Sequence, residues 1–167
     1  MYTYSMDFNC GEGAFTNITH LVNTYGIPNT IIELGVYEGS TTFWMSDNLT
    51  PYNKNLVIHA IDPHVGINDI DRDFSVVQQN FVNNMNLCAN KNVNYIQKDS
   101  SDGLIDLITQ GVEAEFIYID GDHKSSGVLS DLVLAWQVLR IGGVILCDDT
   151  TNFSLGYLSN TFNNSKS

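Results

Sequence analysis

Short apolar runs rich in β-branched residues alternate with longer amphipathic stretches, and this alternation limits the possible folds more than any other feature of the chain. Five runs are short and lack polar alternation, which is typical of strands buried on both faces; they are Thr30–Leu34, Leu56–Ile61, Val93–Gln97, Phe116–Ile119 and Val144–Cys147. Five longer stretches have helical periodicity; they are Phe15–Tyr25, Ser40–Leu49, Asp73–Met85, Ser101–Thr109 and Ser126–Arg140. Strands that alternate with helices pair in parallel through crossover connections. The sequence therefore predicts an α/β fold built on a doubly wound parallel sheet.

The apolar residues of two predicted helices form stripes that indicate which face is buried. In the predicted helix Asp73–Met85, the stripe consists of Phe74, Val77, Phe81 and Met85. In the last predicted helix, Ser126–Arg140, the stripe consists of Leu129, Leu132, Val133, Trp136 and Leu139. Gly142 and Gly143 should end this helix. We expect both stripes to face the sheet.

The bulk composition indicates one globular domain and argues against several classes of protein. A chain of 167 residues, 43% apolar and 16% charged, has room for one core. No apolar run approaches the roughly 20 residues of a membrane helix, and the N-terminus lacks the basic and apolar regions of a secretory signal. A net charge of −12 with only seven Lys and Arg argues against a nucleic-acid partner, because phosphate binding depends on basic side chains.

The use of cysteine and asparagine bears on where the protein acts. Cys10, Cys88 and Cys147 form no CxxC pair and leave an odd thiol, which suits a reducing compartment with each cysteine a small buried residue. Abundant asparagine and scarce arginine are typical of an AT-rich genome, such as that of a virus or phage. We therefore expect a cytoplasmic protein, in the host cytoplasm if the source is viral.

Two glycines in GxxxG spacing follow the first predicted strand. In open parallel sheets, ligands bind beyond the carboxyl ends of the strands, so the residues after each strand are candidates for a site. Gly35 and Gly39 let the backbone turn tightly and approach a ligand, and the helix N-terminus that follows suits a carboxylate or a phosphate. The spacing differs from the GxGxxG of nicotinamide and flavin domains. An ordinary tight turn between strand and helix explains the same glycines.

Acidic and hydroxyl side chains follow the second and third predicted strands. Asp62 could accept both hydroxyls of a ribose, or it could be a solvated loop residue. Asp99 or Ser100 could bond the edge of an adenine ring, although Ser100 could equally cap the next helix.

Three aspartates follow the fourth and fifth predicted strands. Asp120 ends the fourth strand, and Asp148 and Asp149 end the fifth. If these two strands are neighbours, about 4.8 Å apart, the carboxylates would converge and would repel one another unless they were protonated or neutralised by a cation. Hard oxygen ligands point to Mg²⁺ or a similar ion. Alternatively, Asp120 binds the amino group of a cofactor while Asp148 and Asp149 cap a loop.

A histidine lies beside this acidic cluster. An imidazole side chain titrates near neutral pH, so His123 could take a proton from a substrate hydroxyl. It could also orient Asp120 or line the pocket. His20, His59 and His64 have no such neighbours in the sequence, and we expect them to be structural or exposed.

Five segments, in their order and spacing, resemble class I S-adenosylmethionine-dependent methyltransferases. They are ELGVYEGST, AIDPH, KDSSDGL, FIYIDGDHKSSGVLSDL and GGVILCDDT, and they cover roughly residues 29–150. Within that class they are most similar to the metal-assisted small-molecule O-methyltransferases, a branch that includes the catechol type, the macrolide-sugar type and the cephalosporin hydroxylase-like proteins. The resemblance implies a Rossmann-like sheet with five strands in the order 3-2-1-4-5.

The resemblance also implies roles for individual residues. Those that would surround the methionine part of S-adenosylmethionine are Glu33, Gly35, Tyr37, Gly39 and Thr41. Asp62 would hold the ribose, and Asp99 with Ser100 would flank the adenine. Asp120, Asp148 and Asp149 match the family's metal positions, for which we expect Mg²⁺, and the last is often Asn in the catechol type. Asp120 would also contact the cofactor and act in catalysis with His123, which lies in the DGDH signature.

The implied reaction is direct transfer of a methyl group to a hydroxyl of a small molecule, such as a sugar or natural product. Positioning of the two reactants supplies much of the acceleration, and a metal would lower the pKa of the acceptor hydroxyl. Two alternatives remain: a catalytically degenerate domain that only binds S-adenosylmethionine, and a nucleotide-dependent enzyme on a related sheet. We expect no nucleic-acid or membrane partner.

The chain departs from the family after the fifth strand. We expect an N-terminal lead with a helix in residues 1–28, the S-adenosylmethionine-binding domain in residues 29–150 and a short tail in residues 151–167. The tail is too short for the family's last helix and antiparallel strand pair, so we expect the pair to be absent or truncated. A bare fifth strand would be an exposed pairing edge, which favours a homodimer; a fragment of a longer protein is another explanation.

Overall fold

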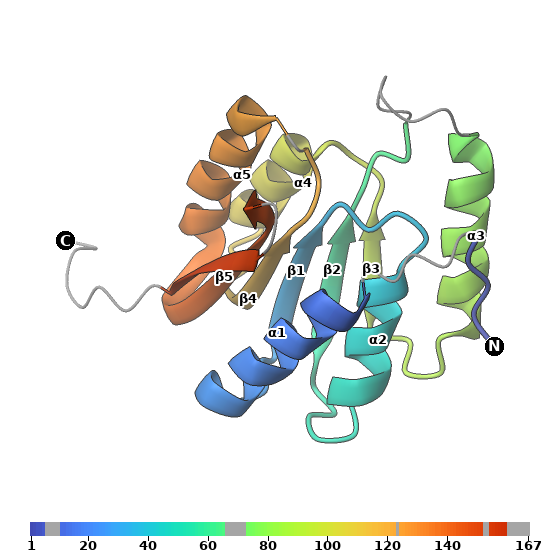
Figure 1. Cartoon of the computed structure of the whole chain (residues 1–167), viewed down its shortest axis with the longest axis horizontal. Helices are drawn as coiled ribbons and strands as arrows, with labels where there is room; N and C mark the ends of the chain where they lie inside the picture. The colour runs from blue at the N-terminus through green and yellow to red at the C-terminus, as the bar shows by residue number, and fades with distance from the viewer. Residues whose placement is uncertain (6–10, 66–72, 123, 152–153, 160–167) are drawn as a thin grey trace.

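The computed structural model describes residues 1–5, 11–65, 73–122, 124–151 and 154–159, and these residues form one sheet with helices on both faces (Figure 1). The strands are β1 (Thr30–Leu34), β2 (Val57–Ile61), β3 (Val93–Ile96), β4 (Ala114–Ile119), β5 (Leu139–Thr151) and β6 (Ser154–Ser159). The helices are α1 (Gly11–Tyr25), α2 (Ser40–Leu49), α3 (Phe74–Leu87), α4 (Ser100–Thr109) and α5 (Ser125–Val138).

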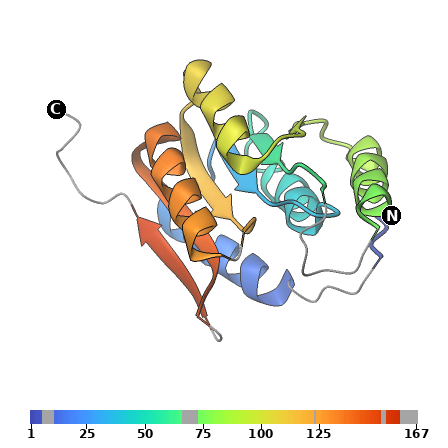
Figure 2. The same cartoon turned by 90° about the horizontal axis from the view of Figure 1, so that it is seen from above.

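The sheet has the strand order β3-β2-β1-β4-β5-β6, and β1 to β5 all pair in parallel. This confirms the predicted doubly wound, Rossmann-like α/β fold with five parallel strands in the order 3-2-1-4-5. Parallel pairing is possible because a helix carries the chain back between successive strands. Figure 2 shows α4 and α5 on one side of the sheet and α1 and α2 on the other.

The strand residues divide between two main cores because successive side chains point to opposite faces. On one face, Leu104 and Leu107 of α4 and Ala135 and Val138 of α5 pack against strand residues such as Ile117. On the other face, Ile18 of α1 and Met45 of α2 pack against the alternate strand positions. These strand residues are Ile31, Phe116, Tyr118 and Leu146. A third cluster contains Phe43 of α2 and Phe81 of α3, so α3 covers the same face as α2. In α3, Val77 and Phe81 are buried and Met85 packs against this third cluster, as its predicted stripe requires.

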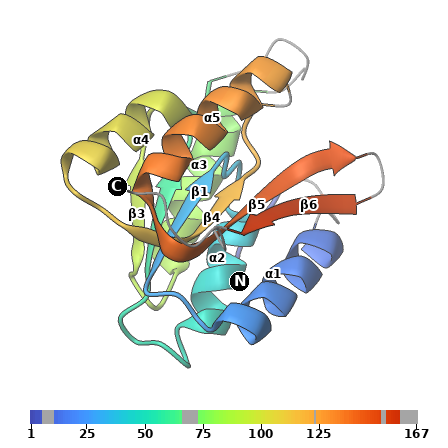
Figure 3. The ribbon, with the colours of Figure 1, turned by 90° about the vertical axis from the view of Figure 1, so that its left-hand side faces the viewer.

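The expectation of a bare fifth strand is wrong. β6 pairs antiparallel with β5, from Val144 opposite Ser159 to Thr151 opposite Ser154 (Figure 3). β6 thus covers the edge of β5 that motivated the prediction of a homodimer. The dimer itself stays a prediction.

The predicted buried stripe of α5 is correct at Leu132, which packs against the core, and at Leu139, which is buried, but it is wrong at its other three positions. Leu129, Val133 and Trp136 are 62%, 56% and 38% exposed, whereas Asp131, Ala135 and Val138 are buried. The two sets have the same i, i+4, i+7 spacing and lie two positions apart, which is about half a turn of the helix. Because apolar residues occur on both faces and an aspartate interrupts the buried one, periodicity did not separate the buried face from the exposed one.

Two expectations concern the membrane and the cysteines. Among the described residues, every helix falls short of the length and hydrophobicity that a bilayer-spanning segment requires. Cys88 and Cys147 are buried free thiols, as predicted. Cys10 lies outside the described residues.

Two valines of α5 provide a matched test of this orientation. Val138→Ala should lower the free energy of unfolding by about 2 kcal/mol, because it removes buried methyl groups. Val133→Ala should change it by less than about 0.5 kcal/mol, because the side chain is exposed and alanine favours helix. Urea unfolding of both variants measures the difference. Equal destabilisation by the two substitutions would contradict the orientation of α5.

Candidate functional site

The site predicted from the sequence lies where the strand order of the sheet reverses. From β1 the chain builds outward through β2 and β3 on one side, and it then returns to place β4 and β5 on the other. Ligands of open parallel sheets bind at the carboxyl ends of the strands at this switch point. We call the residues that directly follow β1 to β5 the site rim.

The loops after β1 and β4 approach each other closely within the site rim. Gly35 has a positive φ of 79°, and a Cβ atom at this position would lie 2.2 Å from the carbonyl oxygen of Asp120. The Asp120 N–H donates to the carbonyl oxygen of Leu34 at 2.8 Å, which fixes the two loops together. At Gly39, which precedes α2 with φ 85°, a Cβ would collide with the Phe43 ring. The packing of the chain thus requires both glycines, and their approach to a ligand stays a prediction.

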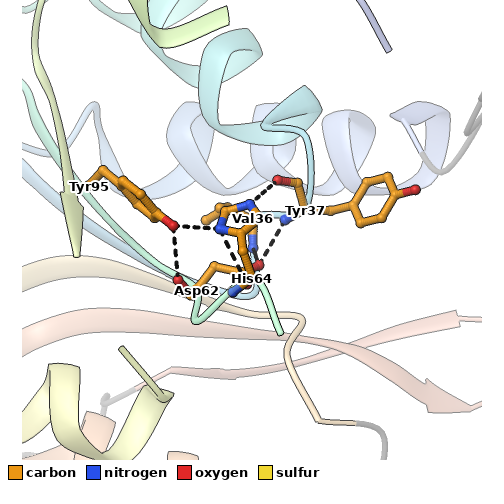
Figure 4. A network of polar contacts seen from close by, with 5 residues as sticks. All are labelled: Val36, Tyr37, Asp62, His64 and Tyr95. Atoms are coloured by element: carbon orange, nitrogen blue, oxygen red, sulfur yellow. Dashed lines mark hydrogen bonds and ion pairs between the residues drawn. The ribbon is translucent and has the colours of Figure 1, made fainter. Parts of the chain in front are cut away.

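The carboxylate of Asp62 organises the loop after β1 (Figure 4). Asp62 Oδ2 accepts the backbone N–H groups of Val36 at 2.8 Å and Tyr37 at 3.0 Å, and Oδ1 accepts the N–H of His64 at 2.7 Å. A carboxylate with this many donors is held in one orientation. Asp62 is therefore an ordered part of the site rim rather than a solvated loop residue, and its binding of a ribose stays a prediction.

A buried histidine and a tyrosine complete this network, and the sequence reasoning missed their part in the site. His64 Nε2 lies 2.7 Å from the carbonyl oxygen of Tyr37, and Nδ1 lies 2.6 Å from the Tyr95 hydroxyl. Since a carbonyl oxygen only accepts, Nε2 carries the hydrogen, and in neutral imidazole Nδ1 then accepts from Tyr95. The signal that could have found them is the short spacing of Asp62 and His64 after β2, with Tyr95 in the neighbouring strand.

Glu33, near the carboxyl end of β1, is almost completely buried, with 1% of its surface exposed. It accepts a hydrogen bond of 2.6 Å from the Thr42 hydroxyl on α2. Burial raises the pKa of Glu33 to about 8; the Thr42 hydrogen bond opposes this shift, and the negative charges of Asp120 and Asp62 add to it. The carboxylates of Asp120 and Asp62 thus act on Glu33 near the carboxyl end of β1. Tyr37 and Thr41, two more predicted cofactor contacts, are half-buried in the same region.

Ser100 is the first residue of α4, and its hydroxyl donates to Asp131 Oδ1 on α5 at 2.6 Å. The N-cap position of α4 belongs to Asp99, which is exposed and makes no side-chain cap bond, so the alternative in which Ser100 caps the helix is wrong. Asp131 Oδ2 is buried without a hydrogen-bond partner among the described residues, and burial raises the pKa of this carboxyl. Sequence reasoning missed Asp131, although an acid on an otherwise apolar helix face was the available signal.

Two of the three aspartates predicted to bind metal meet at one phenol. The Tyr118 hydroxyl lies 3.3 Å from Asp120 Oδ2 and 3.1 Å from Asp148 Oδ2. Ile119 pairs with Cys147, and Asp120 and Asp148 directly follow these two residues, which explains why both carboxylates reach the same oxygen. Burial, with the charges of Asp120 and Asp148, raises the pKa of Tyr118, so this hydroxyl keeps its hydrogen.

The third aspartate and the histidine cannot be compared with the prediction. The side chain of Asp149 and all of His123 lie outside the described residues. In the part of the chain that the structure describes, no group of three His, Cys, Asp or Glu side chains could hold a metal ion. Asp120 and Asp148 still fit Mg²⁺, because this ion is often bound through one or two carboxylates and water.

A surface pocket lies at the opposite end of the sheet. Its lining includes Tyr25, Pro28, Gly142 and an ion pair of 2.7 Å between Glu115 and Arg140. None of the predicted site residues that the structure describes lines this pocket. The site rim is the stronger candidate, because it combines the switch point with interacting polar groups.

The buried carboxyl of Glu33 predicts a pH dependence of stability. Its pKa of about 8 in the folded chain exceeds the ordinary 4.5, so between these values the folded chain keeps a proton that the unfolded chain releases. Stability from this group is therefore lost as the pH rises from about 5 to 8. In urea unfolding at several pH values, Glu33→Gln should lose this part of the slope, whereas Glu113→Gln, an exposed control, should keep it. An unchanged slope in Glu33→Gln would contradict the raised pKa.

Comparison with solved structures places the fold beside known methyltransferase structures. A candidate O-methyltransferase from Klebsiella pneumoniae superposes with a TM-score of 0.62 at 20% identity, over 86% of this chain and 57% of that protein. A candidate caffeoyl-CoA O-methyltransferase from Staphylococcus aureus gives 0.58 at 15% identity, over 81% and 56%. MycE of the mycinamycin pathway, solved with Mg and S-adenosylhomocysteine, gives 0.53 at 15%, over 80% and 31%. At these identities the likeness shows the fold alone.

Comparison of sequences gives a relative and a family. An uncharacterized protein of Acanthamoeba polyphaga mimivirus is 28% identical over 144 residues, which make up 83% of this chain and 60% of that protein. The chain thus spans less than two thirds of this relative. Residues 32–150, which contain the last three residues of β1, all of β2 to β4 and nearly all of β5, match the family described as a methyltransferase domain. The chain therefore belongs to the methyltransferase-domain family.

Proposed function

We propose that this chain transfers the methyl group of S-adenosylmethionine to a hydroxyl of a small molecule, such as a sugar or natural product, with the help of a divalent metal. The observation that carries the proposal is the convergence of Glu33, Asp62 and Asp120 on the switch point of the sheet. The family match supports methyl transfer as the reaction.

The charge of the site rim favours this donor over a dinucleotide. The charges of Asp120 and Asp62 add to the effect of burial on the pKa of Glu33, so these two carboxylates create a negative field at the site, while Glu33 itself is mostly protonated below a pH of about 8. A negative field attracts a sulfonium and an ammonium group, and it opposes the diphosphate of NAD. The net charge of −12 acts in the same direction.

The predicted contacts fit this donor in outline. In our proposal, Glu33, Gly35, Tyr37, Gly39 and Thr41 surround its methionine part. Asp62, already oriented by the loop amides, meets the ribose. Asp99 and Ser100 lie at the start of α4 and flank the adenine; Ser100 would do so as an acceptor, because its hydrogen is donated to Asp131.

Asp120 and Asp148, together with Asp149, are the proposed metal ligands. The contact of Asp120 and Asp148 with one phenol supports a shared site. A divalent cation bound there would supply Lewis-acid chemistry that lowers the pKa of the acceptor hydroxyl. MycE, whose structure holds Mg, has the same fold.

In the proposed reaction, the acceptor oxygen attacks the methyl carbon in line with the departing sulfur. The carbon–sulfur bond breaks with its electron pair on sulfur, which leaves S-adenosylhomocysteine, and a carbon–oxygen bond forms. The acceptor's proton passes to a base, for which we propose His123 or Asp120. Holding the two reactants in line provides the main acceleration.

Calorimetry and product analysis test this proposal together. The chain should bind S-adenosylhomocysteine far more tightly than NAD, and it should produce S-adenosylhomocysteine from S-adenosylmethionine with a member of a panel of hydroxylated sugars and phenols. Asp148→Asn should reduce the metal-stimulated rate at least about 10-fold, because a proposed ligand is lost, while binding of S-adenosylhomocysteine stays within about twofold. Glu113→Gln, an exposed control between α4 and β4, should behave as wild type.

The outcomes separate the alternatives. Binding without turnover across the panel would indicate a domain that binds the donor but lacks activity. Preference for NAD would overturn the choice of donor. Metal stimulation that survives Asp148→Asn would remove Asp148 from the metal site.

A further inference from the structure

Tyr118 connects the interior of the sheet with the two described metal-site carboxylates. Its side chain is 1% exposed and belongs to the apolar cluster that β4 forms with α1 and α2. Its hydroxyl nevertheless reaches Asp120 Oδ2 at 3.3 Å and Asp148 Oδ2 at 3.1 Å. The ring is thus fixed by packing, and its polar end lies at the site rim.

This arrangement reduces the electrostatic repulsion between the two aspartates. Asp120 and Asp148 follow paired residues of neighbouring parallel strands, where like charges disfavour each other. A neutral hydroxyl between them donates its hydrogen to a carboxylate, and its position fixes where both carboxylates point. Carboxylates held at one point lose less side-chain freedom when they bind a cation.

We propose that Tyr118 is a positioning residue that holds Asp120 and Asp148 together as a preformed pair of ligands for a divalent cation. The inference rests on the proposed function, because that function supplies the cation. The phenol acts through the two carboxylates and contacts neither substrate nor cation. Phenylalanine would occupy the same volume in the core, so the hydroxyl can be tested separately from the packing of the ring.

The test is a titration of the whole chain with Mn²⁺, followed by electron paramagnetic resonance of the free ion, and a separate calorimetric titration with S-adenosylhomocysteine. Tyr118→Phe should weaken Mn²⁺ binding about 10-fold or more, as loss of a residue that orients metal ligands does. Binding of S-adenosylhomocysteine should stay within about twofold. Tyr95→Phe, which removes a phenol from the other side of the site rim, should keep the wild-type affinity for Mn²⁺.

A double-mutant cycle shows whether the effect passes through the carboxylates. If Tyr118 acts by orienting Asp148, adding Tyr118→Phe to Asp148→Asn should weaken Mn²⁺ binding by less than it does in the wild-type background. Independent effects in the cycle would contradict positioning of Asp148. An unchanged or higher affinity for Mn²⁺ in Tyr118→Phe alone would overturn the inference.

A second measurement uses the unmodified chain, which avoids any loss of folding in the variant. The ring-carbon resonances of Tyr118 should shift when Mg²⁺ saturates the site, because its hydrogen-bond partners become ligands. Unchanged resonances at saturation would overturn the inference. Failure of the wild-type chain to bind Mn²⁺ or Mg²⁺ would instead overturn the metal part of the proposed function.

Discussion

The parallel pairing of β1 with β4 brings two loops so close that a side chain at position 35 would collide with the backbone of Asp120. This close approach determines the geometry of the site rim. It places the carboxyl of Glu33 close enough to Asp120 for the charge of Asp120 to raise its pKa. Asp62, which accepts a backbone N–H of the loop after β1, acts on Glu33 in the same way. The helices on both faces bury the strands and thereby keep β1 and β4 in register.

A phenol holds the site rim on each of its two sides. On the side of β2 and β3, Tyr95 and His64 fix the loop after β1 together with Asp62. On the side of β4 and β5, Tyr118 meets Asp120 and Asp148. In the proposed function the first side orients the methyl donor and the second prepares the metal site, so the two sides can be altered separately by removing one hydroxyl each.

The sequence predicts the central fold closely because strong local signals coincide there. β1 and α2 have the predicted bounds, since Gly35 and Gly39 separate them and Thr50-Pro51 follows the helix. The predictions fail where tertiary packing decides. The buried face of α5 contains Asp131, whose partner Ser100 lies far away in the chain. β6 depends on pairing with β5, and its sequence alone did not indicate a strand.

The candidate site could be predicted as a set of positions but not as a set of contacts. The order of the motifs pointed to the residues after each strand, because topology places these at one edge. The hydrogen bonds of Asp62 with loop amides and the contact of Tyr118 with two aspartates depend on distances that spacing does not give. His123 and the side chain of Asp149 lie outside the described residues, so their roles rest on the sequence.

The central claim is that the site rim binds the sulfonium nucleoside. Its most direct test is a titration of the ¹⁵N-labelled chain with S-adenosylhomocysteine, followed through the backbone amide resonances. Our account predicts the largest shifts at Gly35, Tyr37, Asp62, Ser100 and Asp120. Saturating ligand that leaves these amides unchanged, or that shifts instead the amides of Tyr25, Glu115 and Arg140 at the opposite end of the sheet, would contradict it.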